Sequence, residues 1–179
     1  TAGAKFQYVQ TTWLDFLLRA QENASFSMQT QIVCRNHGGD ELGPFLNLKY
    51  AHREGLYMDL PRRWSASLGW AMDRSDVEHV ANLLHHADVV TTPASTMGLE
   101  AAIFDTPTVL IGFNEALPEV TRNSLHDYAF LQHYRTIVED DLIPIATDEA
   151  NLIRLINHLL EHPDTYSEQR QTIVDKWIK

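Results

Sequence analysis

The residues with the clearest potential for chemistry gather in one stretch, residues 87–102, which reads ADVVTTPASTMGLEAA. A short apolar run ends there in small hydroxyl residues, and a helix-forming segment follows with Glu100 in its first turns. Backbone N–H groups at a helix start have no partners inside the helix, and the aligned peptide dipoles add positive charge there. Phosphate binds well at such a place. A carboxylate one turn further along can accept hydrogen bonds from a ribose diol, so the pattern predicts half of a nucleotide site.

Each residue of this stretch has a functional and a plainer interpretation. Ser95, Thr96 and Met97 would bind a diphosphate through hydroxyl and backbone groups, but Ser and Thr also cap helices routinely. Glu100 would hold a ribose, but a carboxylate near a helix start is also favourable in itself. Gly98 inside a helix costs up to about 1 kcal/mol relative to Ala, which indicates that something packs closely there.

A second candidate lies where another apolar run ends. Arg35 and His37 are two residues apart, a spacing that puts both on one face of an extended chain. A fixed cation beside an imidazole suits a phosphate or a leaving group. The alternative is a salt bridge in a loop beside a surface histidine. Cys34, just before them, is expected to be a packing thiol and not a nucleophile.

Other chemistries lack the spacing that they need. The nine histidines include no HExxH motif and no Cys/His pattern for zinc, so we expect no bound metal. Neither GxGxxG nor GxxxxGK[ST] occurs, which leaves a dehydrogenase or a P-loop ATPase without support. The net charge of −10 argues against a nucleic-acid partner, because duplex binding requires many basic side chains.

Length and composition predict one domain, residues 1–179, with a core of its own. A single cysteine suits a reducing compartment, and no apolar run has the length of a membrane span, so we expect a cytoplasmic protein. The chain begins without Met and without a signal peptide. We therefore expect a piece cut from a longer protein.

The elements that must position these residues alternate along the chain. Six segments are predicted to be strands: residues 5–9, 31–34, 56–60, 88–91, 108–112 and 143–146. Helices are predicted between and after them: after Thr11 and Thr12 as caps, from the capping box at Ser75–Glu78, over residues 96–104, after Thr147 or Asp148, and from Ser167 with Ile173, Val174 and Trp177 buried.

This alternation predicts an α/β fold, a Rossmann-like doubly wound, mainly parallel sheet of about six strands with helices on both faces. Ligands of such sheets bind beyond the carboxyl ends of the strands. That rule predicts one rim, made of residues 11–12, 35–39, 61–63, 91–96 and 113–114.

Residues 87–113, ADVVTTPASTMGLEAAIFDTPTVLIGF, resemble the C-terminal, donor-binding half of a GT-B glycosyltransferase. The similarity has four parts: the apolar strand with its Asp, the Ser/Thr turn, the helical Glu before two alanines, and a small-x-Pro sequence before the next strand. Arg35-Asn36-His37 is similar to the R-x-H that closes an earlier strand in bacterial surface-polysaccharide transferases and the CDP-glycerol glycerophosphotransferase-like group. The resemblance covers Gln31 to the C-terminus.

The resemblance implies roles for these residues. Ser95, Thr96 and Met97 would contact the donor pyrophosphate, Glu100 the ribose, and Arg35 or His37 the phosphates. It implies a metal-independent transferase of polysaccharide biosynthesis, whose nucleoside-diphosphate donor is a substrate and no tightly bound cofactor. The acceptor domain would precede this half, which alone would be inactive, and the full-length protein would associate peripherally with a membrane.

Two other functions remain open. A helical Glu followed by Pro also occurs in UDP-N-acetylglucosamine 2-epimerases, whose turn is richer in glycine than the one here. The other is a non-enzymatic Rossmann-like module, a scaffold or binding partner, which would expose an apolar patch. Trp64 and Trp70 would supply that patch, and the alternative is that they belong to the core.

Overall fold

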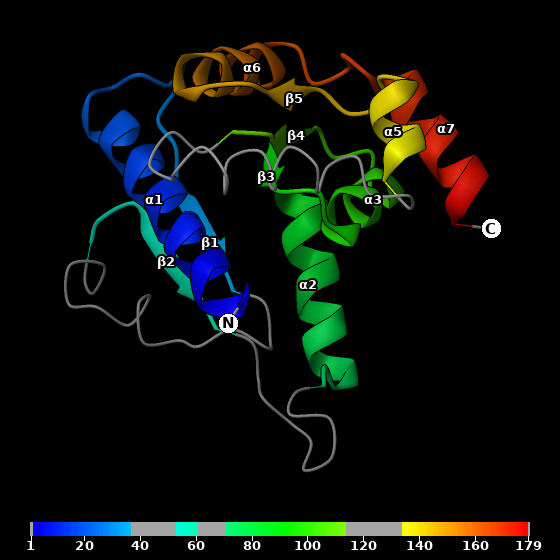
Figure 1. Cartoon of the computed structure of the whole chain (residues 1–179), viewed down its shortest axis with the longest axis horizontal. Coiled ribbons are helices and arrows are strands. Elements are labelled where there is room, and N and C mark those ends of the chain that lie inside the picture. The colour runs from blue at the N-terminus through cyan, green and yellow to red at the C-terminus, as the bar shows by residue number, and fades with distance from the viewer. Residues whose placement is uncertain (1, 37–52, 61–70, 114–133, 179) are drawn as a thin grey trace. The chain divides into compact units, whose positions relative to one another are not determined.

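The structure is a computed structural model that describes residues 2–36, 53–60, 71–113 and 134–178, and only the backbone of residues 2–10. The chain divides into two compact units, Thr1–Ala81 and Asn82–Lys179, called here the N-terminal and the C-terminal unit. Both contain helices and parallel strands, which confirms the predicted α/β class (Figure 1).

A long helix covers a two-stranded sheet in the N-terminal unit. β1 (Ile32–Arg35) and β2 (Leu56–Asp59) pair in parallel, and α1 (Ala2–Glu22) lies along them (Figure 1). Leu14 and Leu18 of α1 are buried against one face of this sheet. The strand residues that they pack against are Ile32, Cys34, Leu56 and Met58. The first half of α2 (Arg74–His86) completes the unit.

The strand predicted at residues 5–9 is wrong, because these residues belong to α1. Their alternation of polar and apolar side chains is too short to distinguish a strand from a helix. The helical run that follows extends through them, since neither Pro nor Gly interrupts residues 4–22. Thr11 and Thr12 consequently lie inside the helix and do not cap it, and they do not lie at the end of a strand.

The C-terminal unit contains a three-stranded parallel sheet. After the second half of α2, the described elements of this unit are β3 (Val90–Thr92), α3 (Thr96–Ile103), β4 (Thr108–Ile111), α5 (Arg135–Glu139), β5 (Ile145–Ala146), α6 (Glu149–Glu161) and α7 (Ser167–Trp177). The strand order is β3-β4-β5, with β4 in the middle. α7 packs against α3, and α6 packs against β4 and β5.

The buried middle strand accounts for much of this unit's core. All four residues of β4 are buried, as its unbroken apolar run predicted. Around it lies a cluster of buried residues: Ala102, Leu110, Tyr134, Ile137, Leu142, Ile143 and Ile173. Five of the six predicted strands are therefore present in the described residues, in two small sheets of two and three strands.

Of the four predicted helix caps, those at α3 and α6 are confirmed. Ser95 caps α3 and accepts a hydrogen bond from the N–H of Met97, and Asp148 caps α6. At α2 the prediction is wrong, because Asp73, not Ser75, accepts the hydrogen bond from the helix's third residue, Asp76. With Asp73 as the cap, the helix begins at Arg74, and Ser75 already lies in its first turn.

One residue predicted to be buried is exposed, and parts of the predicted rim lie outside the described residues. Trp177 is 38% exposed, because it lies in the last turn of α7 beyond the buried Ile173. Residues 37–39, 61–63 and 114 of the rim lie outside the described residues, as do Trp64 and Trp70.

Candidate functional site

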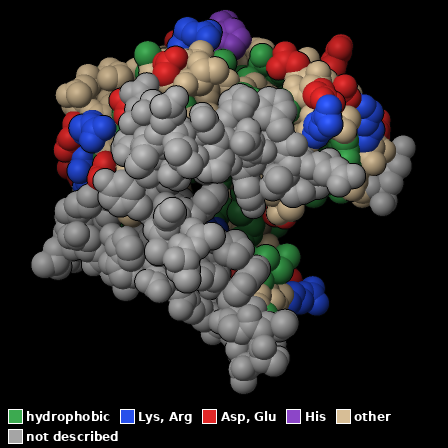
Figure 2. Space-filling model, in the orientation of Figure 1, with side chains coloured by type: hydrophobic (Ala, Val, Ile, Leu, Met, Phe, Trp, Pro, Cys, Tyr) green, Lys and Arg blue, Asp and Glu red, His purple; other side chains and the backbone are tan. Residues whose placement is uncertain are grey.

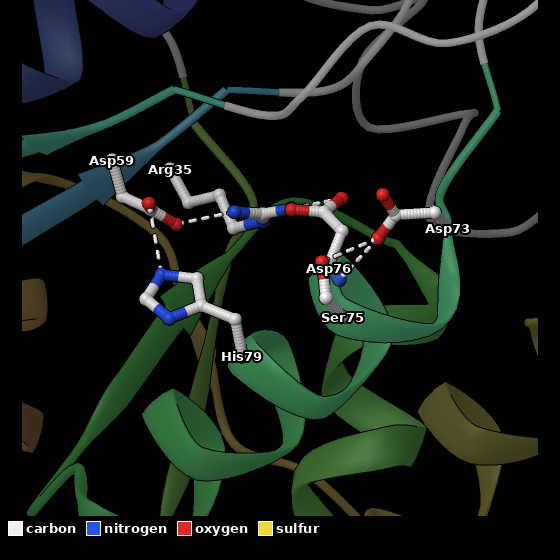
Figure 3. Close-up of polar contacts among 6 residues, drawn as sticks. All are labelled: Arg35, Asp59, Asp73, Ser75, Asp76 and His79. Atoms are coloured by element: carbon white, nitrogen blue, oxygen red, sulfur yellow. Dashed lines mark hydrogen bonds and ion pairs between the residues drawn. The ribbon is translucent and has the colours of Figure 1, made fainter.

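Arg35 lies at the carboxyl end of β1 and holds two carboxylates (Figure 3). One terminal nitrogen of its guanidinium, Nη1, donates to Oδ2 of Asp59, which is opposite Arg35 in the strand register. The other, Nη2, donates to Oδ2 of Asp76 on α2, at 2.8 Å. The three side chains are only 11%, 7% and 3% exposed. The end of β1 is thus joined to β2 and to α2 by nearly buried ion pairs.

His79 extends this network toward the solvent. Its Nε2 lies 3.0 Å from Oδ1 of Asp59, so the two oxygens of that carboxylate serve Arg35 and His79 separately. Asp59 is buried, but the imidazole is 43% exposed. Figure 3 shows the four residues in sequence, from Asp76 through Arg35 and Asp59 to His79. We call this set the Arg35 network.

The start of α2 determines which side chains enter the Arg35 network. Oδ1 of Asp73 accepts hydrogen bonds from the N–H of Asp76 at 2.8 Å and from the Ser75 hydroxyl at 2.7 Å. This cap starts the helix at Arg74. Asp76 and His79, three positions apart, therefore lie on the same side of the helix.

The electrostatics of the Arg35 network favour charge on the guanidinium. Burial alone would lower the pKa of Arg35, but the hydrogen bonds and charges of Asp59 and Asp76 outweigh it and raise that pKa. The cation is already matched by two anions. A phosphate approaching Arg35 would compete with both carboxylates, and the predicted role of Arg35 toward a donor's phosphates stays a prediction.

Cys34 has the surroundings of an unreactive thiol. Burial, and secondarily the negative charge of Asp59, raise the pKa of Cys34 to about 11. The reactive form of cysteine is the thiolate, which is scarce at neutral pH when the pKa is so high. The side chain packs with Leu14 and Leu18 of α1, in keeping with the predicted packing role.

A second arrangement lies in the C-terminal unit, where β3 leads into α3. Oγ of Ser95 accepts from the N–H of Met97 at 3.3 Å, and the carbonyl of Ser95 accepts from the N–H of Gly98 at 3.0 Å. Thr96 is exposed. Among the described residues, no acceptor is found for its N–H group or its hydroxyl, so both can reach a ligand.

Glu100 follows one turn later and is half-buried. Leu99 before it packs on the core, and Ala101 after it is fully buried. In the part of the chain that the structure describes, the Glu100 carboxylate makes no hydrogen bond and no ion pair. Such a group lacks the partners that a partly desolvated carboxylate requires.

Tyr134 fixes the turn in front of α3. Its hydroxyl donates to the Ser95 carbonyl at 2.9 Å, and the ring is only 1% exposed. Burial raises the pKa of Tyr134, and the hydrogen bond to Ser95 offsets part of that rise. A Cβ atom on Gly98 would come within 2.8 Å of the tyrosine oxygen. This contact is the close packing that a glycine inside the helix indicated.

The structure brings together some of the predicted site residues. Ser95, Thr96, Met97 and Glu100 all lie in the first turns of α3 or directly before it. Arg35 belongs to the N-terminal unit, and His37 lies outside the described residues. Sequence reasoning missed Asp59, and it assigned no role to His79. An available signal was position: Asp59 is the last residue but one of the strand predicted at residues 56–60, and Arg35 directly follows the strand predicted at residues 31–34.

The described residues outside these two arrangements carry charges of both signs. Among the coloured side chains in the upper part of Figure 2, acidic ones lie beside basic ones. Three or more potential metal ligands do not come together anywhere in residues 2–36, 53–60, 71–113 and 134–178. In those same ranges, none of the helices combines the length and the apolar character needed to span a bilayer.

Comparisons of the chain with protein-family models, with curated proteins and with solved structures gave no match.

Proposed function

We propose that this chain is the nucleotide-sugar-binding half of a GT-B glycosyltransferase, which moves a sugar or similar group from a nucleoside-diphosphate donor to an acceptor. The observation that supports it most is the start of α3. A Ser-capped helix begins directly after a parallel strand, and a half-buried carboxylate without a described partner, Glu100, lies one turn further on. Donor pyrophosphate at the helix start and ribose hydroxyls at Glu100 would complete both groups.

The chemistry of such a site is electrostatic. When the donor breaks, negative charge develops on the departing nucleoside diphosphate, and a positive helix end already aimed at it stabilises that charge. Arg35 or His37 would assist at the phosphates. This scheme needs no metal and no tightly bound cofactor, because the nucleoside-diphosphate donor is a substrate.

The proposal has consequences for the rest of the molecule. An N-terminal domain outside this chain would bind the acceptor, so the half described would bind nucleotide weakly and transfer little or nothing. The whole enzyme would act in polysaccharide biosynthesis in the cytoplasm, with peripheral attachment to a membrane. Its donor half would be one domain with a doubly wound sheet of about six strands. The described residues form five strands, in sheets of two and three.

Isothermal titration with UDP, GDP and CDP tests the proposal. We expect heat of binding with at least one, and the preferred base identifies the donor class. Glu100→Ala is expected to weaken binding by about 1–3 kcal/mol, because the ribose hydroxyls then lose a partly buried partner. Glu168→Ala is the matched control, since this exposed glutamate occupies the first turn of α7. The absence of heat with all three nucleotides would reject the proposal.

The two alternatives give different results in related experiments. An enzyme similar to the 2-epimerases would convert UDP-N-acetylglucosamine to its C2 epimer, which proton NMR of the sugar detects. A scaffold module would bind none of the nucleotides, and Glu100→Ala would leave its partner binding unchanged.

A further inference from the structure

The Arg35 network contains more than an arginine needs for its own neutralisation. One carboxylate, Asp76, already pairs with Nη2 of the guanidinium. Asp59 pairs with Nη1 and, through its other oxygen, with His79. Arg35 and the two aspartates together carry one positive and two negative charges, so the group next to the imidazole has a net charge of −1.

Asp59 determines how the imidazole of His79 presents its two nitrogens. A carboxylate oxygen accepts only, so the nitrogen 3.0 Å from it, Nε2, must carry the proton. In the neutral ring the lone pair then belongs to Nδ1. In the part of the chain that the structure describes, Nδ1 makes no hydrogen bond or ion pair, and 43% of the side chain is exposed.

A proton accepted at Nδ1 would leave the contact between Nε2 and Asp59 in place. An imidazolium at position 79 would keep its Nε2–H bond to Asp59 and would bring the network's charge to zero. Asp59 itself cannot turn away easily, because Arg35 holds its second oxygen and the side chain is 7% exposed. A buried carboxylate that orients an imidazole and stabilises its protonated form is the arrangement that makes histidine an effective base.

We propose that His79, oriented by Asp59, is a proton-accepting site for the hydroxyl group of water or an alcohol. In the step, the O–H bond breaks and its proton goes to Nδ1. The oxygen's electron pair forms a bond to an electrophilic carbon, and the leaving group departs with its own electron pair. The inference does not rest on the start of α3 or on Glu100, because all four residues belong to the N-terminal unit.

The test is hydrolysis of an activated ester, p-nitrophenyl acetate, by the whole chain. The rate is measured as the release of p-nitrophenolate. His79→Gln is expected to lower the protein-catalysed rate by about tenfold. This factor is smaller than the usual contribution of a positioned base, because the described part of the protein has no binding site for this probe. His86→Gln is the matched control, because His86 is an exposed imidazole of the same helix and forms no ion pair in the described residues. It should change the rate less than twofold, on the order expected of an unassisted surface imidazole.

Two aspartate variants separate orientation of the imidazole from structural support. Asp59→Asn should lower the rate about as much as His79→Gln does, whereas Asp76→Asn breaks an ion pair to the same guanidinium and leaves Asp59 on His79. Asp76→Asn should therefore keep most of the rate. Thermal unfolding of each variant shows whether it is folded.

If Asp59→Asn does not fold, the wild-type rate in heavy water decides. A rate slower in D2O than in H2O, lost in His79→Gln, supports a proton in transfer at His79. Equal rates for His79→Gln, His86→Gln and wild type, or a rate without a solvent isotope effect, would overturn the proposal and leave His79 as part of a structural ion pair.

Discussion

Arg35 is the residue on which the polar contacts of the N-terminal unit depend. It joins β1 to β2 and to α2 through two carboxylates that are almost buried. A buried ion pair adds little net stability over apolar packing, but the removal of one partner leaves uncompensated charge, which is costly. In this network the loss of the single cation would strand two anions.

We therefore expect Arg35→Met to reduce the free energy of unfolding by about 3–5 kcal/mol, as for other broken buried pairs. Arg74→Met is the control, because Arg74 pairs with Glu78 on the surface, where the side chains are 92% and 60% exposed. That variant should lose at most about 0.5 kcal/mol. Urea unfolding of both variants measures the difference. Similar midpoints for the two would show that Asp59 and Asp76 lose little when the guanidinium is removed.

At this scale the sequence reveals candidate residues but not their partners. Arg35 is recognisable because it follows an apolar strand, yet Asp59 and Asp76 are 24 and 41 residues away. Asp59 meets Arg35 only in the observed strand register, and a slip by one residue would put it on the other face. His79 is one of nine histidines, and nothing in its neighbours distinguishes it.

The element that positions the proposed nucleotide site is α3, and its fit depends on Gly98. In an exposed helix, replacing Gly with Ala stabilises by up to about 1 kcal/mol. Here the new methyl group would lie 2.8 Å from the Tyr134 oxygen, and the buried ring cannot swing aside. The steric cost should exceed the gain in helix propensity.

Gly98→Ala is accordingly expected to destabilise the protein by about 1–3 kcal/mol, as overpacking in other cores does. Tyr134→Phe removes the clashing oxygen and also the hydrogen bond to Ser95, and it should cost about 1 kcal/mol alone. The double variant should be more stable than the sum of the two costs predicts. A double-mutant cycle of urea unfolding measures this coupling, and strict additivity would mean that Tyr134 does not restrict position 98.

Elements were predictable where their pattern is long or their ends are marked. The run at residues 108–111 has no polar alternation, and it forms the buried β4. Asp148 marks the start of α6, and Leu152, Ile156 and Leu159 are buried along it. Residues 5–9 carry neither kind of signal, because a five-residue alternation also fits an amphipathic helix. Packing of α1 on the sheet decides that case, and packing is not visible in local sequence.

At the scale of the whole molecule, each unit has an arginine, little exposed, that joins its elements. Arg35 does so in the N-terminal unit. In the C-terminal unit, Arg170 of α7 is 4% exposed and donates to Oδ1 of Asp105 at 2.6 Å. It also donates to the carbonyls of Thr165 at 2.7 Å and Pro163 at 3.0 Å. The two hydrophobic clusters found among the described residues are likewise made of residues from one unit each.

This organisation makes a prediction about cooperativity that hydrogen exchange can test. Arg170→Met should raise amide exchange in α3, β4 and α7, because it leaves Asp105 and two carbonyls without their donor. Arg35→Met should raise exchange in β1 and β2. Each effect should stay within its unit if the units open separately. α2 crosses from one unit to the other, so its amides do not enter the comparison. A uniform rise along the whole chain in either variant would instead show that residues 1–179 open as the single domain that length and composition predict.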